Sequence, residues 1–217
     1  MNPLFPANAA PITFYTFPLS GHCHRVALML SLLELPYEAV EVDLMSGAHK
    51  EAAFLQLNAL GQVPVIVDNG TVISDSNAIL VYLAQAYGAP GLWLPTEAKR
   101  LAEVQRWLTL TASHVATRLS PARWRTLTGN GDTPETEAAR AASHDFLRLM
   151  ERMIAGRDFL VGNTPTLADV AAYAYVAHVP EGGVSLADYP LIRAWVARVA
   201  AQPRFVPMVA SPIPDVA

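Results

Sequence analysis

The spacing of apolar and polar positions changes character partway along the chain. Before residue 88, short β-branched and aromatic runs alternate with segments whose apolar residues recur at helical spacing. The runs predict strands at 12–17, 37–44, 63–68 and 71–74. The helical patterns fall at 23–34, 49–58 and 76–87. An Asp-Asn-Gly turn between the last two runs predicts a β-hairpin.

The order β-α-β-α-β-β-α predicts a thioredoxin-like α/β domain over residues 1–87, in which a β-α-β unit brings two strands together in parallel. The next segment, "GAPGLWLPT" (88–96), has the glycine and proline punctuation of a linker. Beyond it no strand pattern is convincing, and we expect residues 97–217 to form an all-helical domain. Its predicted helices cover 97–119, 135–155, 163–179 and 188–201.

Composition narrows the classes of protein. Hydrophobic residues make up 52% of the chain and charged residues only 16%, which favours a subunit interface, so we expect a homodimer. The net charge of −4 and the scattered arginines argue against nucleic acid binding. No run approaches the roughly 20 apolar residues of a membrane helix, so no membrane partner is expected. Cys23, the single cysteine, cannot form an internal disulfide, which favours a reducing cytoplasm.

Candidate chemistry is densest in "FPLSGHCHRVALML" (17–30), where Ser20, His22, Cys23 and His24 stand almost side by side. A metal site is disfavoured, because residues i and i+2 of a helix point about 200° apart. A structural zinc would also need four ligands, and no second cysteine or histidine pair lies nearby. We therefore expect no metal here, and we expect His24 to be a surface residue of the first helical turn.

Ser20 and Cys23 each allow two interpretations. Ser20 follows a predicted strand and precedes a predicted helix, so it can cap that helix. Because a helix N-terminus stabilises anions, the same hydroxyl can also hold a thiolate and lower its pKa. Cys23 is either a reactive thiol at this helix end or a small buried apolar residue, and the second interpretation is favoured.

Two further motifs indicate which anion Ser20 would face. Pro64 lies just inside a predicted strand; it is either an edge-strand proline or part of a cis Val63–Pro64 bond that aims the Val63 N–H and C=O at an extended peptide-like ligand. Asp75 and Ser76 precede an apolar helix, as plain caps or as a clamp. In the clamp, Ser76 and the helix N-terminus take a carboxylate while Asp75 takes an ammonium group. Glutathione fits all three features, because it combines an amino-acid end, a peptide and a thiol.

With these motifs in view, the chain resembles the cytosolic glutathione transferases. The resemblance is carried by "SGHCHRVALMLSLLELPYEAVEVDL", "GAHKEAAFLQLNALGQVPVIVDNG" and "SDSNAILVYLA", and later by "FLVGNTPTLADVAAYAYV", in which Thr166 and Asp169 form a helix capping box. It implies glutathione as co-substrate, attack of its thiolate on an electrophile, a homodimer, and a helical domain that lines the second-substrate pocket.

The resemblance also assigns roles residue by residue. Ser20 stands where the serine-type classes keep their activating hydroxyl, whereas the tyrosine-type position holds Thr16 and Cys23 lies three residues beyond the cysteine-type position. The remaining matches are contacts to glutathione. They are His49 and Lys50 for its glycine end, Gln62, Val63 and Pro64 for backbone pairing, and Asp75 and Ser76 for its γ-glutamyl end.

Trp107, Thr111 and His114 share one face of the predicted helix 97–119 and can line the second-substrate pocket, although a helix flank at the edge of the core has the same pattern. We therefore expect a glutathione transferase that conjugates hydrophobic electrophiles. A glutathione-dependent disulfide reductase or peroxidase, using Cys23, is one alternative. A non-catalytic binding or assembly domain is another, and the intact polar clamp argues against it.

Overall fold

The structure is a computed structural model that describes residues 2–6 and 9–214. The chain divides into two compact units, Met1–Leu94 with Pro203–Met208, and Pro95–Gln202 with Val209–Ala217. The boundary near residue 94 lies inside the expected linker. The expectation that everything after residue 96 belongs to the helical domain differs from the structure at 203–208. This segment joins the first unit through hydrogen bonds from Ser31 Oγ to the Arg204 carbonyl and from His24 Nε2 to the Val206 carbonyl. No local sequence pattern predicts these contacts.

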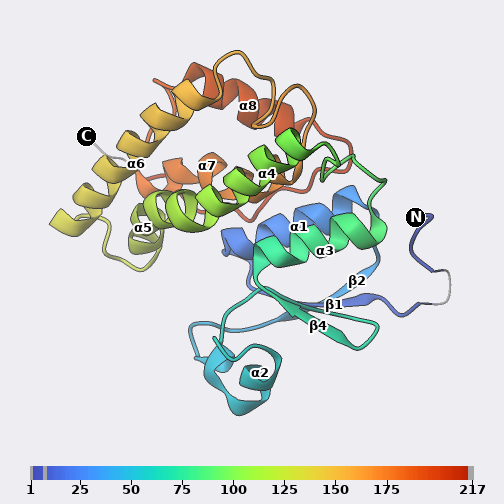
Figure 1. The fold of residues 1–217 in the computed structure, drawn as a ribbon. Coiled ribbons are helices and arrows are strands. Elements are labelled where there is room, and N and C mark those ends of the chain that lie inside the picture. Colours follow the sequence, from blue (N-terminus) through green and yellow to red (C-terminus); the bar gives the residue numbers. More distant parts are fainter. Residues whose placement is uncertain (1, 7–8, 215–217) are drawn as a thin grey trace. The chain divides into compact units, whose positions relative to one another are not determined.

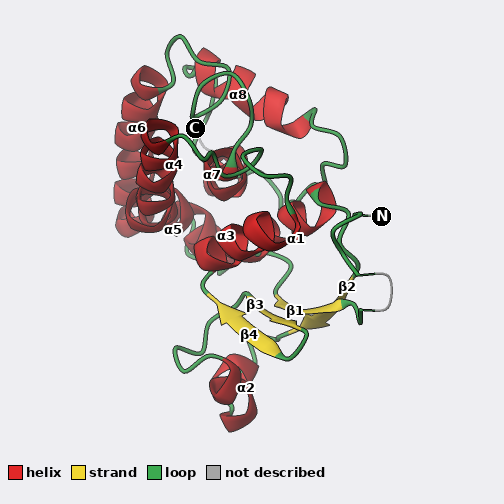
Figure 2. Cartoon of the chain, turned by 45° about the vertical axis from the view of Figure 1, so that its right-hand side comes forward, coloured by secondary structure: helices red, strands yellow, loops and turns green. Residues whose placement is uncertain are grey.

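The first unit is built on a four-stranded sheet of order β2-β1-β3-β4 (Figures 1 and 2). β1 pairs in parallel with β2, while β3 pairs antiparallel with both β1 and β4. The strands are β1 (Ile12–Thr16), β2 (Tyr37–Glu41), β3 (Val65–Asp68) and β4 (Thr71–Ser74). The helical segments are α1 (Gly21–Leu32), η1 (Ala48–Lys50), α2 (Ala52–Leu57) and α3 (Ser76–Tyr87). The element order confirms the predicted thioredoxin-like fold.

Alternation along the strands explains the layering of this unit. Figure 2 shows α1 and α3 on one face of the sheet and α2 on the other. On the α2 face, Tyr15 and Val65 are register partners and pack with Phe54 of α2. The neighbouring residues Phe14 and Ile66 point to the opposite face, where they are buried. Both faces of the sheet are thus covered at the end that carries the site described below.

The helix α3 has the bounds that the sequence predicts, because both of its ends are marked by special residues. Asp75 caps the N-terminus with its side chain. At the other end, a Cβ at Gly88 would lie 2.5 Å from the Ala84 carbonyl oxygen, so only glycine fits there without a shift.

The second unit is helical, as expected. Its helices are α4 (Ala98–Leu110), α5 (Ala116–Leu127), α6 (Pro134–Met153), α7 (Leu167–Ala177) and α8 (Pro190–Ala200), with a π-helical segment at Thr111–Val115 and a 3₁₀ segment, η3, at Val179–Gly182. The predicted helix 97–119 therefore continues to Leu127 through the π segment.

The predicted capping box is confirmed at the start of α7, a helix buried nearly all round that packs against α4, α5 and α8. The Asp169 carboxylate accepts the Thr166 N–H at 2.8 Å. It also accepts the Leu160 N–H and the Trp195 indole N–H, each at 2.8 Å. Asp169 therefore ties three segments of this unit together.

Candidate functional site

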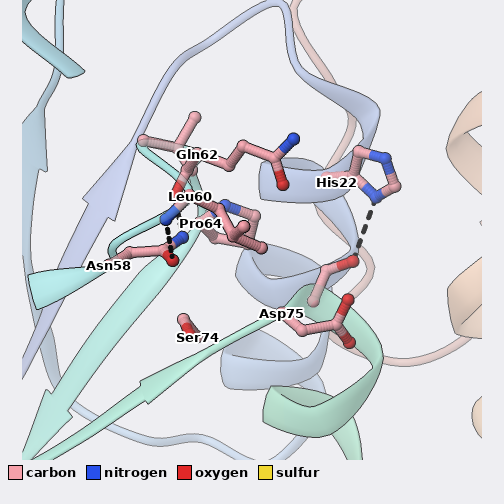
Figure 3. Close-up of a pocket in the computed structure, with 9 residues that line it drawn as sticks. His22, Asn58, Leu60, Gln62, Pro64, Ser74 and Asp75 are labelled. Atoms are coloured by element: carbon pink, nitrogen blue, oxygen red, sulfur yellow. Dashed lines mark hydrogen bonds between the residues drawn. The ribbon is translucent and has the colours of Figure 1, made fainter. Parts of the chain in front are cut away.

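A small cavity of about 110 Å³ lies in the first unit, where the connection before β3 meets the first turns of α1 and α3 (Figure 3). Its lining combines residues that the sequence predicted with others that it did not. The lining residues are His22, Asn58, Leu60, Gln62, Val63, Pro64, Ser74, Asp75 and Ser76. Because cavities that enclose whole small molecules measure roughly 300–1,000 Å³, this one suits one end of an extended ligand.

One wall of the cavity is the segment that contains Val63 and Pro64. The bond between them is cis, as expected. Asn58 Nδ2 donates to the Gln62 carbonyl at 2.8 Å and holds the segment beside α2. No hydrogen bond from the described part of the chain engages the Val63 N–H or C=O, so both groups can pair with an incoming backbone.

The opposite wall begins with Asp75, which has a positive φ of 71° and caps α3. Its Oδ1 accepts the N–H groups of Asn77 and Ala78, each at 2.9 Å. The side chain is nevertheless exposed and lines the cavity, so its second oxygen can meet a ligand cation. Capping therefore uses one oxygen of the carboxylate and leaves the other open to a ligand.

Ser76 is the most buried polar group of the cavity, with 3% of its surface exposed. Its Oγ lies 3.1 Å from Arg25 Nη1 and 3.0 Å from His22 Nδ1, the second contact being drawn in Figure 3. Arg25 is fully buried and also donates to Asn77 Oδ1 at 2.8 Å. These bonds join α1 and α3 across the site.

The two histidines of the opening motif have different places. His22 lines the cavity, and burial, reinforced by the positive charge of Arg25, lowers its pKa to about 3, so the ring is neutral at physiological pH. The sequence patterns did not predict His22 as part of the site, and its position two residues after Ser20 was the only signal for it. The expectation that His24 is a surface residue is wrong, because it is 5% exposed and its Nε2 lies 2.8 Å from the Val206 carbonyl oxygen.

Ser20 stands at the N-terminus of α1 as predicted, and its Oγ accepts the Cys23 N–H at 3.3 Å. It does not line the cavity itself, but it precedes by two residues the histidine that does. Because this hydroxyl acts as an acceptor in the cap, its proton can be donated to a ligand.

Cys23 is 1% exposed, and its sulfur accepts the Phe17 N–H at 3.3 Å. Burial raises the pKa of the thiol and outweighs the opposing hydrogen bonds from Ser20, the Phe17 backbone and Thr16. A protonated, inaccessible thiol is a poor nucleophile. The structure therefore favours the packing interpretation of Cys23 and gives its expected catalytic role no support.

His49 and Lys50 lie in η1, outside the cavity lining. Lys50 Nζ donates to the carbonyls of Leu60 and Gly61, each at 3.1 Å, which places it beside the loop that forms one wall. The fit is tight, since a Cβ at Gly61 would lie 2.7 Å from the His49 carbonyl oxygen. Contact of His49 and Lys50 with the glycine end of glutathione stays a prediction.

The three residues expected in the second-substrate pocket belong to the second unit. Trp107 is 2% exposed and donates its indole N–H to the Leu160 carbonyl at 3.1 Å. Thr111 is fully buried and donates to the Leu108 carbonyl at 2.8 Å. The alternative role at the edge of the core accounts for the burial of both, and their place in a second-substrate pocket stays a prediction. His114 is exposed, and its part in substrate binding stays a prediction.

Metal-binding clusters and membrane-spanning helices are both absent from the described residues. Within 2–6 and 9–214, no three histidine, cysteine or acidic side chains gather where they could hold a metal ion. None of the helices in this part of the chain has the length and apolar character needed to cross a membrane.

Fold and site together define a class of protein, in which a thioredoxin-like unit with a pocket for an amino-acid-like end is combined with a helical unit. Comparison with known proteins agrees. The model of the glutathione S-transferase N-terminal domain matches residues 19–86, and that of the C-terminal domain matches residues 106–203. The chain belongs to the glutathione transferase family, and it is an enzyme of that family.

Individual relatives match along most of their length. Glutathione S-transferase 3 of Zea mays is 33% identical over 94% of this chain and 96% of its own. Glutathione S-transferase theta-1 of Mus musculus is 30% identical over 88% and 82%. The crystal structure of a glutathione S-transferase from Pseudomonas fluorescens superposes with a TM-score of 0.86 at 34% identity, covering 92% of this chain and 100% of that one.

Proposed function

We propose that this enzyme is a serine-type glutathione transferase, in which Ser20 stabilises the glutathione thiolate and the thiolate attacks a hydrophobic electrophile. The observation that carries the proposal is the cavity in which the Val63 backbone, Asp75 and Ser76 converge next to the N-terminus of α1. Each of these groups has the chemistry that one part of glutathione requires.

The γ-glutamyl end is the part that a cavity of about 110 Å³ suits. We assign its carboxylate to the N-terminus of α3, where the helix dipole, the Ser76 N–H and the Ser76 hydroxyl favour an anion, while Asp75 caps the N–H groups of Asn77 and Ala78. Its ammonium group meets the exposed Asp75 carboxylate. The central peptide pairs with the N–H and C=O of Val63, and the glycine end extends toward His49 and Lys50.

The thiol then reaches the N-terminus of α1. There the Ser20 hydroxyl donates a hydrogen bond to the sulfur, and the helix end adds partial positive charge. A hydrogen bond to a charged group is worth about 1.5–3 kcal/mol, which corresponds to a lowering of the bound thiol pKa by one to two units. The thiolate forms a carbon–sulfur bond with the electrophile, and the leaving group departs with the bonding electron pair.

The family resemblance supports three further parts of the proposal: assembly as a homodimer, a cytoplasmic location, and detoxification as the role. A redox function through Cys23 is disfavoured by the burial and raised pKa of its thiol.

The test is a Ser20→Ala variant with Cys23→Ala as the matched control, because the two residues lie in the same helical turn. Absorbance of the thiolate measures the pKa of bound glutathione, and a panel of electrophiles, hydroperoxides and disulfides measures turnover. Ser20→Ala should raise the bound thiol pKa by one to two units and lower the conjugation rate about 10- to 100-fold. An unchanged pKa and rate would refute the mechanism, and activity lost only in Cys23→Ala would indicate redox chemistry.

A further inference from the structure

The tautomer of His22 determines the direction in which the Ser76 hydroxyl donates its hydrogen. A hydroxyl has one hydrogen to donate and two lone pairs that accept. Arg25 is always a donor, so its Nη1, 3.1 Å away, occupies one lone pair of Ser76 Oγ. His22 Nδ1, 3.0 Å away, is a donor in one tautomer and an acceptor in the other.

The two tautomers present the cavity with opposite groups. When Nδ1 of His22 accepts, the Ser76 hydrogen points at the ring and the hydroxyl offers a ligand only a lone pair. When Nδ1 carries the proton, both lone pairs of Ser76 are occupied, and its hydrogen is directed to a ligand. A carboxylate needs the second arrangement, because an ionised carboxylate is only an acceptor.

We propose that His22 is a positioning residue for the carboxylate of the γ-glutamyl end: by donating from Nδ1 to Ser76 Oγ, it turns the Ser76 hydroxyl into a donor toward that carboxylate. The inference rests on the proposed function, since it assigns the carboxylate to the N-terminus of α3. Ser76 is the residue that touches the ligand, and His22 acts through it.

Three features of the site support this role. Ser76 is almost fully buried, so the two neighbouring side chains constrain the direction of its hydroxyl. Arg25 is fully buried and bonded to Asn77 as well, which fixes the other partner of the hydroxyl. The low pKa of His22 keeps the ring neutral, and a neutral ring is the form that can exchange one tautomer for the other.

The first test compares glutathione with an analogue whose γ-glutamyl α-carboxylate is replaced by hydrogen. His22→Leu removes the Nδ1 donor, and it should weaken glutathione binding about tenfold while leaving binding of the analogue unchanged. His22→Asn should restore most of the affinity, because its amide can occupy the place of Nδ1 and donate. An equal loss for both ligands would show that His22 only supports the fold, and would overturn the proposal.

The second test needs no variant. Nitrogen NMR of the His22 ring in the wild-type protein, saturated with glutathione, should show the proton on Nδ1. A ring that keeps its proton on Nε2 in the complex would overturn the proposal even if the variants misfold. The proposed function is tested separately, since wild-type protein that fails to bind immobilised glutathione would refute it before His22 is considered.

Discussion

Substitution of Asp75 can separate its role as the cap of α3 from its proposed role in binding glutathione. Oδ1 of Asp75 caps α3 through the N–H groups of Asn77 and Ala78, and the exposed remainder of the carboxylate is proposed to bind the ligand ammonium. Asparagine keeps an oxygen for the cap and has nearly the same side-chain shape at the positive φ of 71°, but it carries no charge. Alanine keeps neither the cap nor the charge.

The size of each effect follows from the site. Asp75→Asn should cost at most about 1 kcal/mol of unfolding free energy, because the two residues cap equally well and only the helix dipole term is lost. Asp75→Ala should cost about 1–3 kcal/mol, from the lost cap and the strained backbone. Since Asp75 is exposed, the charge pair is worth about 1 kcal/mol, so Asp75→Asn should weaken glutathione binding about fivefold.

Urea unfolding measures the effect of each substitution on stability, and calorimetric titration with glutathione measures its effect on binding. Raising the salt concentration from 0.05 M to about 0.5 M should weaken binding to the wild-type protein more than to Asp75→Asn, because only the former keeps the charge pair. Equal glutathione affinity of Asp75→Asn and wild type would remove the charge from the clamp. A loss of stability in Asp75→Asn as large as in Asp75→Ala would refute the capping argument.

Three other outcomes follow from the structure. The pKa of His22 is about 3 in the folded chain and about 6.5 in the unfolded chain, so between these values the unfolded chain takes up a proton that the folded chain does not. The unfolding free energy should therefore fall below pH 6.5 by up to about 1.4 kcal/mol per pH unit. His22→Asn should flatten that slope in pH-dependent unfolding. Asp169→Ala should lower the unfolding free energy by about 3–5 kcal/mol in urea unfolding, because three buried donors lose their acceptor, and a loss below about 1 kcal/mol would contradict its role as a hub. Gly182→Ala should lower the melting temperature in calorimetry, because its Cβ would lie 2.5 Å from the Arg123 backbone nitrogen, whereas Gly131→Ala, with its nearest neighbour at 3.6 Å, should not.

Local patterns in the sequence were sufficient wherever the structure depends on local physics. The helix Ser76–Tyr87 was predicted to the residue, because a capping side chain and a close-fitting glycine mark its ends. The hairpin followed from its turn residues. The π segment Thr111–Val115 was missed, because it leaves the spacing of apolar positions almost that of a continuous helix.

Contacts between distant segments were not predictable in the same way. His24 has a partner 182 residues later, and no spacing rule connects them. His22 was considered only as a metal ligand, since its role depends on Ser76, 54 residues away. The burial of Trp107 likewise depends on Leu160, which lies in a loop outside its helix. The sequence therefore indicated more than half of the residues that line the cavity, but few of those that hold them in place.

Helix capping does not exclude the proposed roles of Ser20 in catalysis and of Asp75 in ligand binding, because each side chain has enough hydrogen-bonding groups for both roles. Ser20 Oγ accepts the Cys23 N–H with a lone pair, so its hydrogen is not used by the cap and can turn from the buried Cys23 sulfur to a ligand thiolate. Oδ1 of Asp75 accepts both cap N–H groups, and Oδ2 can accept from an ammonium. A helix cap therefore places a polar group at the end of the helix where ligands bind, already rigid and oriented. Because the fold has already fixed these groups, their ordering adds little entropy cost when glutathione binds. Substitutions that keep the cap but change the remaining group should therefore alter binding or rate, and should change the unfolding free energy by at most about 1 kcal/mol.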